Sequence, residues 1–375
     1  MSFNRFYVIS PLALVAVSAC RSPHTTNSAV SGNIVKGPLS NALVFLDLDG
    51  DNQLDANEQS IRTDANGKFT INTTATNYKI VALTDDSTVD TSSGAILAGV
   101  TLSAPKGAAV VTPTTTLMEE GGLTKEEVAE VLGLPDGVDP LTFNPFAAGV
   151  DAATALAVEK VSQQLMTAVS SFASAAEGAG ASEKGAFEAA LKSVVDVVKT
   201  KAAKAKDPNA SAADKKIDFT KADDLELIKA QVTTKAAALD GIDMTTMNAI
   251  ANDTRDAIKN VNDKVATVTD LKSDTTKNIF STTQVLKDQV KNASVDKKAG
   301  KVANIAFKNK AEVDTQAKNK APQDIKLTGD GTISENASSL VIGTVSTVDT
   351  DQDSGTAFKY KLAGKDADFF SLNER

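Results

Sequence analysis

The spacing of hydrophobic residues changes twice along the chain. In residues 29–112 they form short runs, at 42–46, 67–71 and 78–83, with turn residues such as Asn66-Gly67 between them. This pattern predicts short antiparallel strands in an N-terminal β-sandwich. From 113 to 318 they recur every three or four residues, which predicts a central α-helical bundle or coiled-coil region. Short strands return in residues 319–375, so we expect a multidomain β and α protein that ends in a partial β-sandwich.

Two segments of the helical region have the clearest patterns. Thr124 and Glu127 have the spacing of a capping box, and Gly133 follows a short apolar stripe, so a helix is predicted over residues 125–132. A longer stripe runs from Met244 to Val268 at alternating steps of three and four. It is rich in small and polar residues, which indicates a modest core, and we interpret this region as a spacer or a partner-binding bundle.

Composition excludes several classes of function. The net charge is −9, which argues against a nucleic-acid partner. The one Cys and the one His both lie in the first 25 residues, ahead of the predicted domains. Nucleophilic triads, zinc sites and haem need residues of these types, so we expect a protein that is not an enzyme. Catalysis by carboxylates alone, as in glycoside hydrolysis, is the one enzymatic alternative.

The first 28 residues predict export from the cytoplasm. The apolar run at 8–19 is shorter than the ~20 residues that span a membrane, and it ends in small residues. Val17-Ser18-Ala19-Cys20 resembles the lipobox of bacterial lipoproteins. The resemblance implies a signal peptide at 1–20, lipidation of Cys20, a tether at 21–28 and a membrane-anchored, surface-exposed protein of the cell envelope. An ordinary signal peptide with an incidental Cys is the alternative.

An acidic loop lies within the first β region. Carboxylates occupy positions 1, 3, 5, 9 and 12 of the window from 47 to 58, and an amide occupies position 7. This is the spacing of oxygen ligands in a calcium loop, although no helices flank it and Gly stands at position 4 where an EF-hand has it at 6. The window contains no basic residue, so a cation would relieve the repulsion between its charges. The predicted calcium (Ca2+) ligands are Asp47, Asp49, Asp51, Gln53, Asp55 and Glu58; the alternative is a solvated acidic hairpin.

The sequence around this loop resembles bacterial surface domains. Residues 32–47 read Gly-x-Ile-Val-Lys-Gly-Pro-Leu-x-x-Ala-x-Val-Phe-Leu-Asp, and Asp-x-Asn-Gly-x-Phe follows at 64–69. Together they resemble Cna-B-like, SdrD B-like or carboxypeptidase-regulatory-like domains over about residues 29–85. The resemblance implies a β-sandwich on the cell surface.

The C-terminal segment resembles the start of a cadherin-like repeat. The order Asn-x-Ala-Pro, Glu-Asn, Gly-Thr-Val, Asp-x-Asp-x-x-Ser-Gly and Tyr-x-Leu spans residues 319–375. The resemblance implies calcium ligands at Glu335, Asp349 and Asp351, with Asp353 as a further oxygen nearby. The later acidic motifs of such a repeat are missing, so we expect an incomplete repeat. A small immunoglobulin-like cap without metal is the alternative.

These patterns and resemblances predict a calcium-binding bacterial surface lipoprotein that mediates cell adhesion. The expected partner is a cell-surface or matrix protein, or a second copy of the same chain in homophilic adhesion. The alternative is a structural or scaffold lipoprotein of the envelope, whose helical region binds a partner and whose calcium ions only stabilise the fold.

Overall fold

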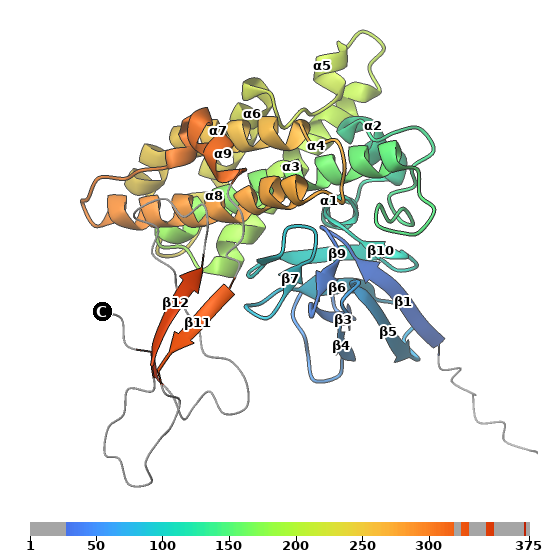
Figure 1. Cartoon of the computed structure of the whole chain (residues 1–375). Helices are drawn as coiled ribbons and strands as arrows, with labels where there is room; N and C mark the ends of the chain where they lie inside the picture. Colours follow the sequence, from blue (N-terminus) through green and yellow to red (C-terminus); the bar gives the residue numbers. More distant parts are fainter. Residues whose placement is uncertain (1–27, 319–323, 330–342, 349–370, 373–375) are drawn as a thin grey trace, which may run out of the picture.

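The computed structural model describes residues 28–318, 324–329, 343–348 and 371–372 (Figure 1). The fold combines β and α, as expected, and among these described residues 48% are helical and 16% lie in strands. The helices form a layer that covers one end of the N-terminal sheets, while the C-terminal strands form a separate ribbon (Figure 1). Within the described residues, no helix is both long enough and apolar enough to cross a membrane.

A four-stranded antiparallel sheet carries the acidic loop. Its strand order is β4-β3-β6-β9. In the register of β3 and β6, Asp47 stands opposite Lys79 and Leu43 opposite Leu83. The strands predicted at 42–46 and 78–83 correspond to β3 and β6. The bounds are β3 Leu43–Asp47, β4 Ser60–Arg62, β6 Lys79–Leu83 and β9 Thr101–Pro105.

Two three-stranded sheets complete the N-terminal part. In the sheet β10-β1-β5, β5 is antiparallel to β1 but β10 is parallel to it, so the expected all-antiparallel arrangement is wrong for this pair. The strand predicted at 67–71 corresponds to β5, whose buried and exposed residues alternate. The remaining sheet has the order β2-β7-β8. The bounds are β1 Ser28–Ile34, β5 Lys68–Thr73, β10 Val110–Val111, β2 Leu39–Ser40, β7 Val89–Asp90 and β8 Ala95–Ile96.

Two short helices lead from the sheets to the helical layer. The first, α1 at Pro113–Gly121, begins where Thr112 accepts a hydrogen bond from the Thr115 N–H, with Pro at the first helical position. The sequence pattern had not delimited this helix. The second, α2 at Lys125–Leu132, confirms the predicted one, because both reciprocal hydrogen bonds of the capping box form. Its C-cap residue, Gly133, has the left-handed conformation that glycine adopts without strain.

The helical layer is built around α3. It packs against α4, α7 and α8, and α6 packs against α4 and α7. The stripe predicted from Met244 to Val268 lies on α7 as far as Val265, and its residues from Met247 to Val265 are buried in this bundle. Val268 follows the end of the helix. The bounds are α3 Ala152–Gly178, α4 Glu183–Ala205, α5 Ala212–Lys215, α6 Ala222–Ala236, α7 Met244–Ala266, α8 Asp274–Lys298, the 3-10 helix η1 Ala306–Lys308 and α9 Lys310–Gln316.

One hydrophobic cluster joins the sheets to the helices. It contains Ile34 of β1, Leu102 of β9, Leu117 of α1, Phe172 of α3 and Val261 of α7, each fully buried. Because α1 packs on both β9 and α4, it connects the two parts of this core. The core is therefore continuous across residue 112.

The C-terminal ribbon pairs β11, Asp324–Thr328, with β12, Thr344–Val348. The strands are antiparallel, and Asp324 stands opposite Val348. The predicted cadherin-like ligands lie outside the described residues, and so does the predicted lipidation site; they are Glu335, Asp349, Asp351, Asp353 and Cys20.

Candidate metal site in the loop between β3 and β4

The acidic loop leaves the four-stranded sheet at the end of β3 and returns to it at β4. Asp47 is the last residue of β3, and its side chain is buried. The chain then turns sharply, because Gly50 has φ 90° and Asn52 has φ 60°. Gly and Asn are the residues that adopt this left-handed conformation at least cost, so the sequence suits the turn.

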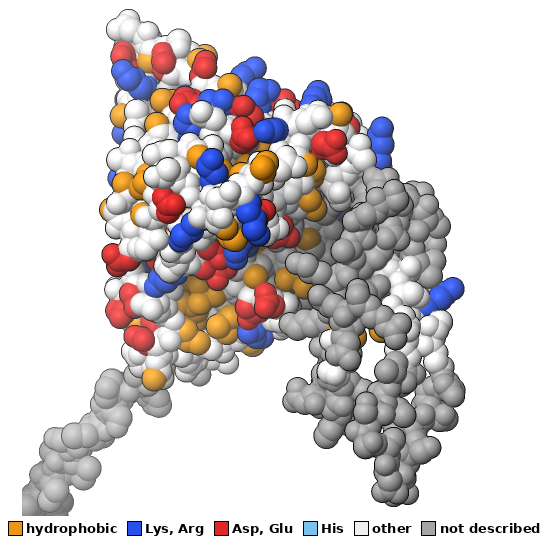
Figure 2. All heavy atoms as spheres, turned by 90° about the vertical axis from the view of Figure 1, so that its left-hand side faces the viewer, with side chains coloured by type: hydrophobic (Ala, Val, Ile, Leu, Met, Phe, Trp, Pro, Cys, Tyr) orange, Lys and Arg blue, Asp and Glu red, His pale blue; other side chains and the backbone are white. Residues whose placement is uncertain are grey.

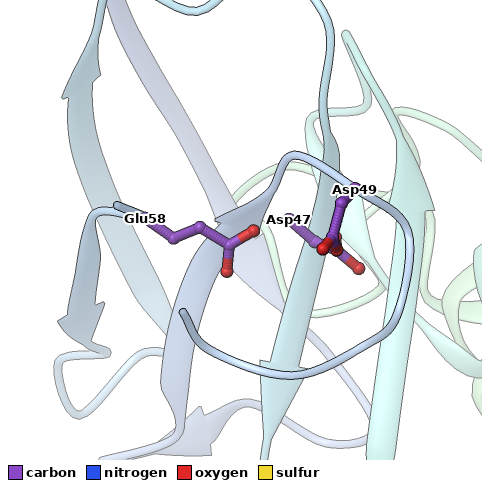
Figure 3. A group of neighbouring side chains, drawn as sticks. All are labelled: Asp47, Asp49 and Glu58. Carbon is purple, nitrogen blue, oxygen red and sulfur yellow. The ribbon is translucent and has the colours of Figure 1, made fainter. Parts of the chain in front are cut away.

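Three carboxylates converge inside this loop. Each of Asp47, Asp49 and Glu58 offers an oxygen, and these oxygens all lie within 4.8 Å of one another. The carboxylates of Asp47 and Asp49 lie close together, and Glu58 points toward them from the far end of the loop (Figure 3). Carboxylate oxygens are the ligands that calcium and magnesium prefer. We call these three residues the acidic triad.

Backbone groups hold Asp47 in place. Oδ1 accepts a hydrogen bond from the Gly50 N–H at 2.6 Å, and Oδ2 accepts one from the Asn52 N–H at 2.9 Å. Burial by itself would raise the pKa of Asp47, but these two N–H groups and the nearby Lys79 ammonium outweigh it. The pKa of Asp47 therefore lies below its usual value, and the side chain is an anion at neutral pH.

Glu58 closes the loop. Its Oε1 accepts a hydrogen bond from the Leu48 N–H at 2.7 Å, and its Oε2 accepts one from the Asp55 N–H at 3.0 Å. Both ends of the loop are thus attached to one carboxylate. Each oxygen keeps a lone pair with which it can bind a cation.

The other predicted ligands do not belong to the triad. Asp51 accepts hydrogen bonds from the backbone N–H of Gln53 at 2.7 Å and from its Nε2 at 2.6 Å. Asp55 is exposed, and its backbone N–H, not its carboxylate, contacts Glu58. The structure therefore brings three of the six predicted residues together.

A lysine from a neighbouring strand also reaches the loop. Lys79 Nζ lies 3.5 Å from Oδ2 of Asp47 and 3.8 Å from Oε1 of Glu120 on α1, and it donates to the Gly50 carbonyl at 3.1 Å. Glu120 also accepts a hydrogen bond from Asn52 Nδ2 at 3.3 Å. A basic residue from outside the window therefore offsets part of the repulsion that the sequence alone assigned to a bound cation. Sequence reasoning missed Lys79 because it lies 32 residues from Asp47 and reaches it only through the pairing of β3 with β6.

The residues present fit a weakly held calcium ion. The triad offers hard oxygen ligands, and exposed loop positions leave room for water and backbone carbonyls to fill a shell of six to eight oxygens. The Lys79 ammonium would repel the ion and compete with it for Asp47. This combination suits the weak affinity of extracellular calcium modules, which bind at ~10⁻⁴ to 10⁻³ M.

A second charged cluster lies between the sheets and α3. Lys36 Nζ lies 3.0 Å from Oδ2 of Asp90, and both side chains are almost completely buried. Nearby, Glu159 of α3 accepts hydrogen bonds from the Gly37 N–H at 3.0 Å and from Gln163 Nε2 at 2.7 Å. Burial raises the pKa of Glu159 to about 8, so this carboxyl is mostly protonated at neutral pH. The cluster joins the turn between β1 and β2, β7 and α3 in the interior of the protein.

The exposed charges of the helical part are mixed. Lys and Arg side chains alternate with Asp and Glu over the face shown in Figure 2. Several form ion pairs, such as Arg255 with Glu226 at 2.6 Å and Lys264 with Asp314 at 2.8 Å. This surface therefore gives no support to a nucleic-acid interface, which needs a patch of positive charge.

Comparisons of the chain with protein-family models, with curated proteins and with solved structures each gave no match. The assignment of a function therefore depends on the geometry of the candidate sites and on the sequence motifs.

Proposed function

We propose that this chain is a calcium-binding protein of the bacterial cell surface that mediates adhesion through its C-terminal cadherin-like segment. A lipidated Cys20 holds it in the membrane. Calcium at the loop after β3 makes the N-terminal part rigid, and calcium at the C-terminal segment orders the adhesive end. The partner is a cell-surface or matrix protein, or a second copy of the chain.

The acidic triad carries this proposal. Three oxygens within 4.8 Å, one of them on a buried carboxylate held by two backbone N–H groups, make a preorganised set of hard ligands. The lipobox-like motif at the N-terminus supports export, and extracellular fluid supplies the millimolar calcium that a weak site requires. The motifs in residues 319–375 support the adhesive role.

Aggregation of coated beads tests the adhesive role. Beads that carry the full chain through its N-terminus should aggregate in millimolar calcium and disperse when a chelator is added. The variant Asp349→Asn/Asp351→Asn should not aggregate. Asp366→Asn/Asp368→Asn, which removes two carboxylates with the same spacing outside the predicted ligands, should aggregate normally. Aggregation that persists in chelator would rule out adhesion through calcium.

The second candidate is an envelope scaffold whose helical region binds a partner. One observation favours it: a cleft of about 480 Å³ lies between the loop at 50–54 and the start of α4. Ligand sites in proteins commonly have volumes of ~300–1,000 Å³ and lie where two structural parts meet. For this candidate calcium only stabilises the fold. The full chain immobilised on a sensor should then bind its partner in chelator as well as in calcium, whereas bead aggregation should not occur.

A further inference from the structure

The cleft between the sheets and the helical layer has an apolar floor. Val100, Phe187 and Leu191 line it, and each is more than nine-tenths buried. Leu54 stands at its edge with 39% of its surface exposed. The floor and this edge together offer apolar surface that a ligand can bury.

The charges that line the cleft are mostly negative. Four carboxylates face two ammonium groups, and both of the lysines, Lys184 and Lys192, pair with Glu188 at 3.9 and 3.6 Å. Asp51 is held by Gln53, and Glu120 lies near Lys79. The pairs within the cleft therefore do not neutralise all of its carboxylates.

Glu183 is the carboxylate that remains. It is exposed in the first turn of α4, and it makes no hydrogen bond or ion pair with the part of the chain that the structure describes. Lys287 and Lys291 both lie close enough for their pKa values to respond to Glu183. Their ammonium groups donate elsewhere, that of Lys287 to the Ala98 carbonyl at 2.6 Å and that of Lys291 to Glu177 at 2.5 Å. The Glu183 carboxylate lies against Gly99 on the other wall of the cleft, where an added Cβ would come within 2.0 Å of Oε1.

We propose that this cleft binds a peptide segment of a partner protein, in which a Lys or Arg stands beside a large apolar residue. The cation of the segment pairs with Glu183, and the apolar side chain packs against Leu54 and Phe187. An anionic ligand is disfavoured because it would add to the excess of carboxylates. This inference rests on the second proposed function, because it names the chemistry of the partner that the helical region binds.

Two short peptides test the proposal with the full chain. The probes are acetyl-Leu-Lys-Leu-amide and acetyl-Leu-Glu-Leu-amide, and the readout is the amide NMR signals of residues 50–54 and 183–192. The lysine peptide should shift these signals saturably in the millimolar range, and the glutamate peptide should bind at least fivefold more weakly. Equal binding of the two peptides, or no saturable shift with the lysine peptide, overturns the proposal.

Matched variants locate the contact. Glu183→Gln should weaken the lysine peptide at least fivefold, whereas Glu130→Gln, at an exposed position on α2, should not change its binding. If both variants bind the peptide as tightly as the original chain, the Glu183 contact is wrong. Each titration is run in calcium and in chelator. Equal peptide binding in calcium and in chelator is the result that the second proposed function predicts. Peptide binding with no calcium-dependent shift of the signals of residues 47–58 would sustain the cleft while removing the calcium site, and such a shift without peptide binding would do the reverse.

Discussion

Lys79 Nζ lies 3.5 Å from Oδ2 of Asp47, its direct cross-strand partner on β3. The Asp47 side chain has no solvent-exposed surface, and that of Lys79 keeps 12% of its surface exposed. The lysine therefore supplies the positive charge that a carboxylate at this depth requires. A calcium ion bound to the triad would take over part of that role, so the ammonium and the metal oppose one another at Asp47.

Replacing Lys79 tests this opposition. In chelator, Lys79→Met should lower the free energy of unfolding by about 1–3 kcal/mol, because a buried anion loses its charged partner. In calcium, the same variant should bind the ion more tightly than the original chain, since the repulsion is removed. Urea unfolding at several calcium concentrations measures both effects.

The control for this prediction is Lys68→Met on β5, where the lysine is exposed. It should change stability by less than about 0.5 kcal/mol. If Lys79→Met and Lys68→Met behave alike, the Lys79 charge does not act on the triad.

Most of the elements could be predicted from local patterns, and the electrostatics of the loop could not. The helix at Lys125–Leu132 carries its capping box and its terminating Gly133 in the sequence, so its ends could be read directly. Asp47 and Lys79 give no such signal, because only the register of β3 with β6 brings them together. The sequence also does not show which acidic residues of the loop converge. Their convergence depends on hydrogen bonds to the backbone, which the spacing of the ligands alone does not specify.

The buried cluster of Lys36, Asp90 and Glu159 shows a second limit of prediction from the sequence. Lys36 ends a predicted strand and directly precedes the turn residues Gly37-Pro38, and Glu159 is followed by Lys160 in a helical segment. Nothing local marks either residue as buried. Their burial follows from the way α3 lies against the sheets, which sequence periodicity does not determine.

Removing one partner of the buried ion pair should be costly. Asp90→Ala leaves the Lys36 ammonium without its carboxylate at 3.0 Å, and we expect a loss of about 3–5 kcal/mol in the free energy of unfolding. The double variant Lys36→Met/Asp90→Leu should lose much less, because two apolar side chains need no such partner. Urea unfolding distinguishes the two cases. A double variant as unstable as Asp90→Ala would show that packing, and not charge, sets the cost.

Glu159 should make stability depend on pH. The pKa of this carboxyl is about 8 in the folded chain, against 4.5 as its ordinary value, so the folded state holds the proton more tightly. The neutral Glu159 carboxyl contributes its full amount to the free energy of unfolding below pH 4.5, and this contribution declines as the pH rises toward 8. Glu159→Gln cannot ionise, so its stability relative to the original chain should increase between pH 5 and pH 8.5.

Chemical unfolding at closely spaced pH values measures this difference. Glu130→Gln on α2 is the matched control, since its carboxyl is exposed, and it should follow the original chain throughout. A constant difference between Glu159→Gln and the original chain over this range would show that Glu159 does not gain a proton on folding.

Thermal unfolding in calcium, magnesium and chelator tests the central claim most directly. A ligand that binds only the folded state adds ~2.7 kcal/mol at a hundredfold excess over its Kd. We therefore predict that calcium raises the unfolding temperature more than magnesium does. Asp49→Asn, which removes a member of the triad, should abolish that rise, and Asp55→Asn, an equal change of charge in the same loop, should retain it. No rise in calcium, or an equal loss in the two variants, would contradict a calcium site at the triad.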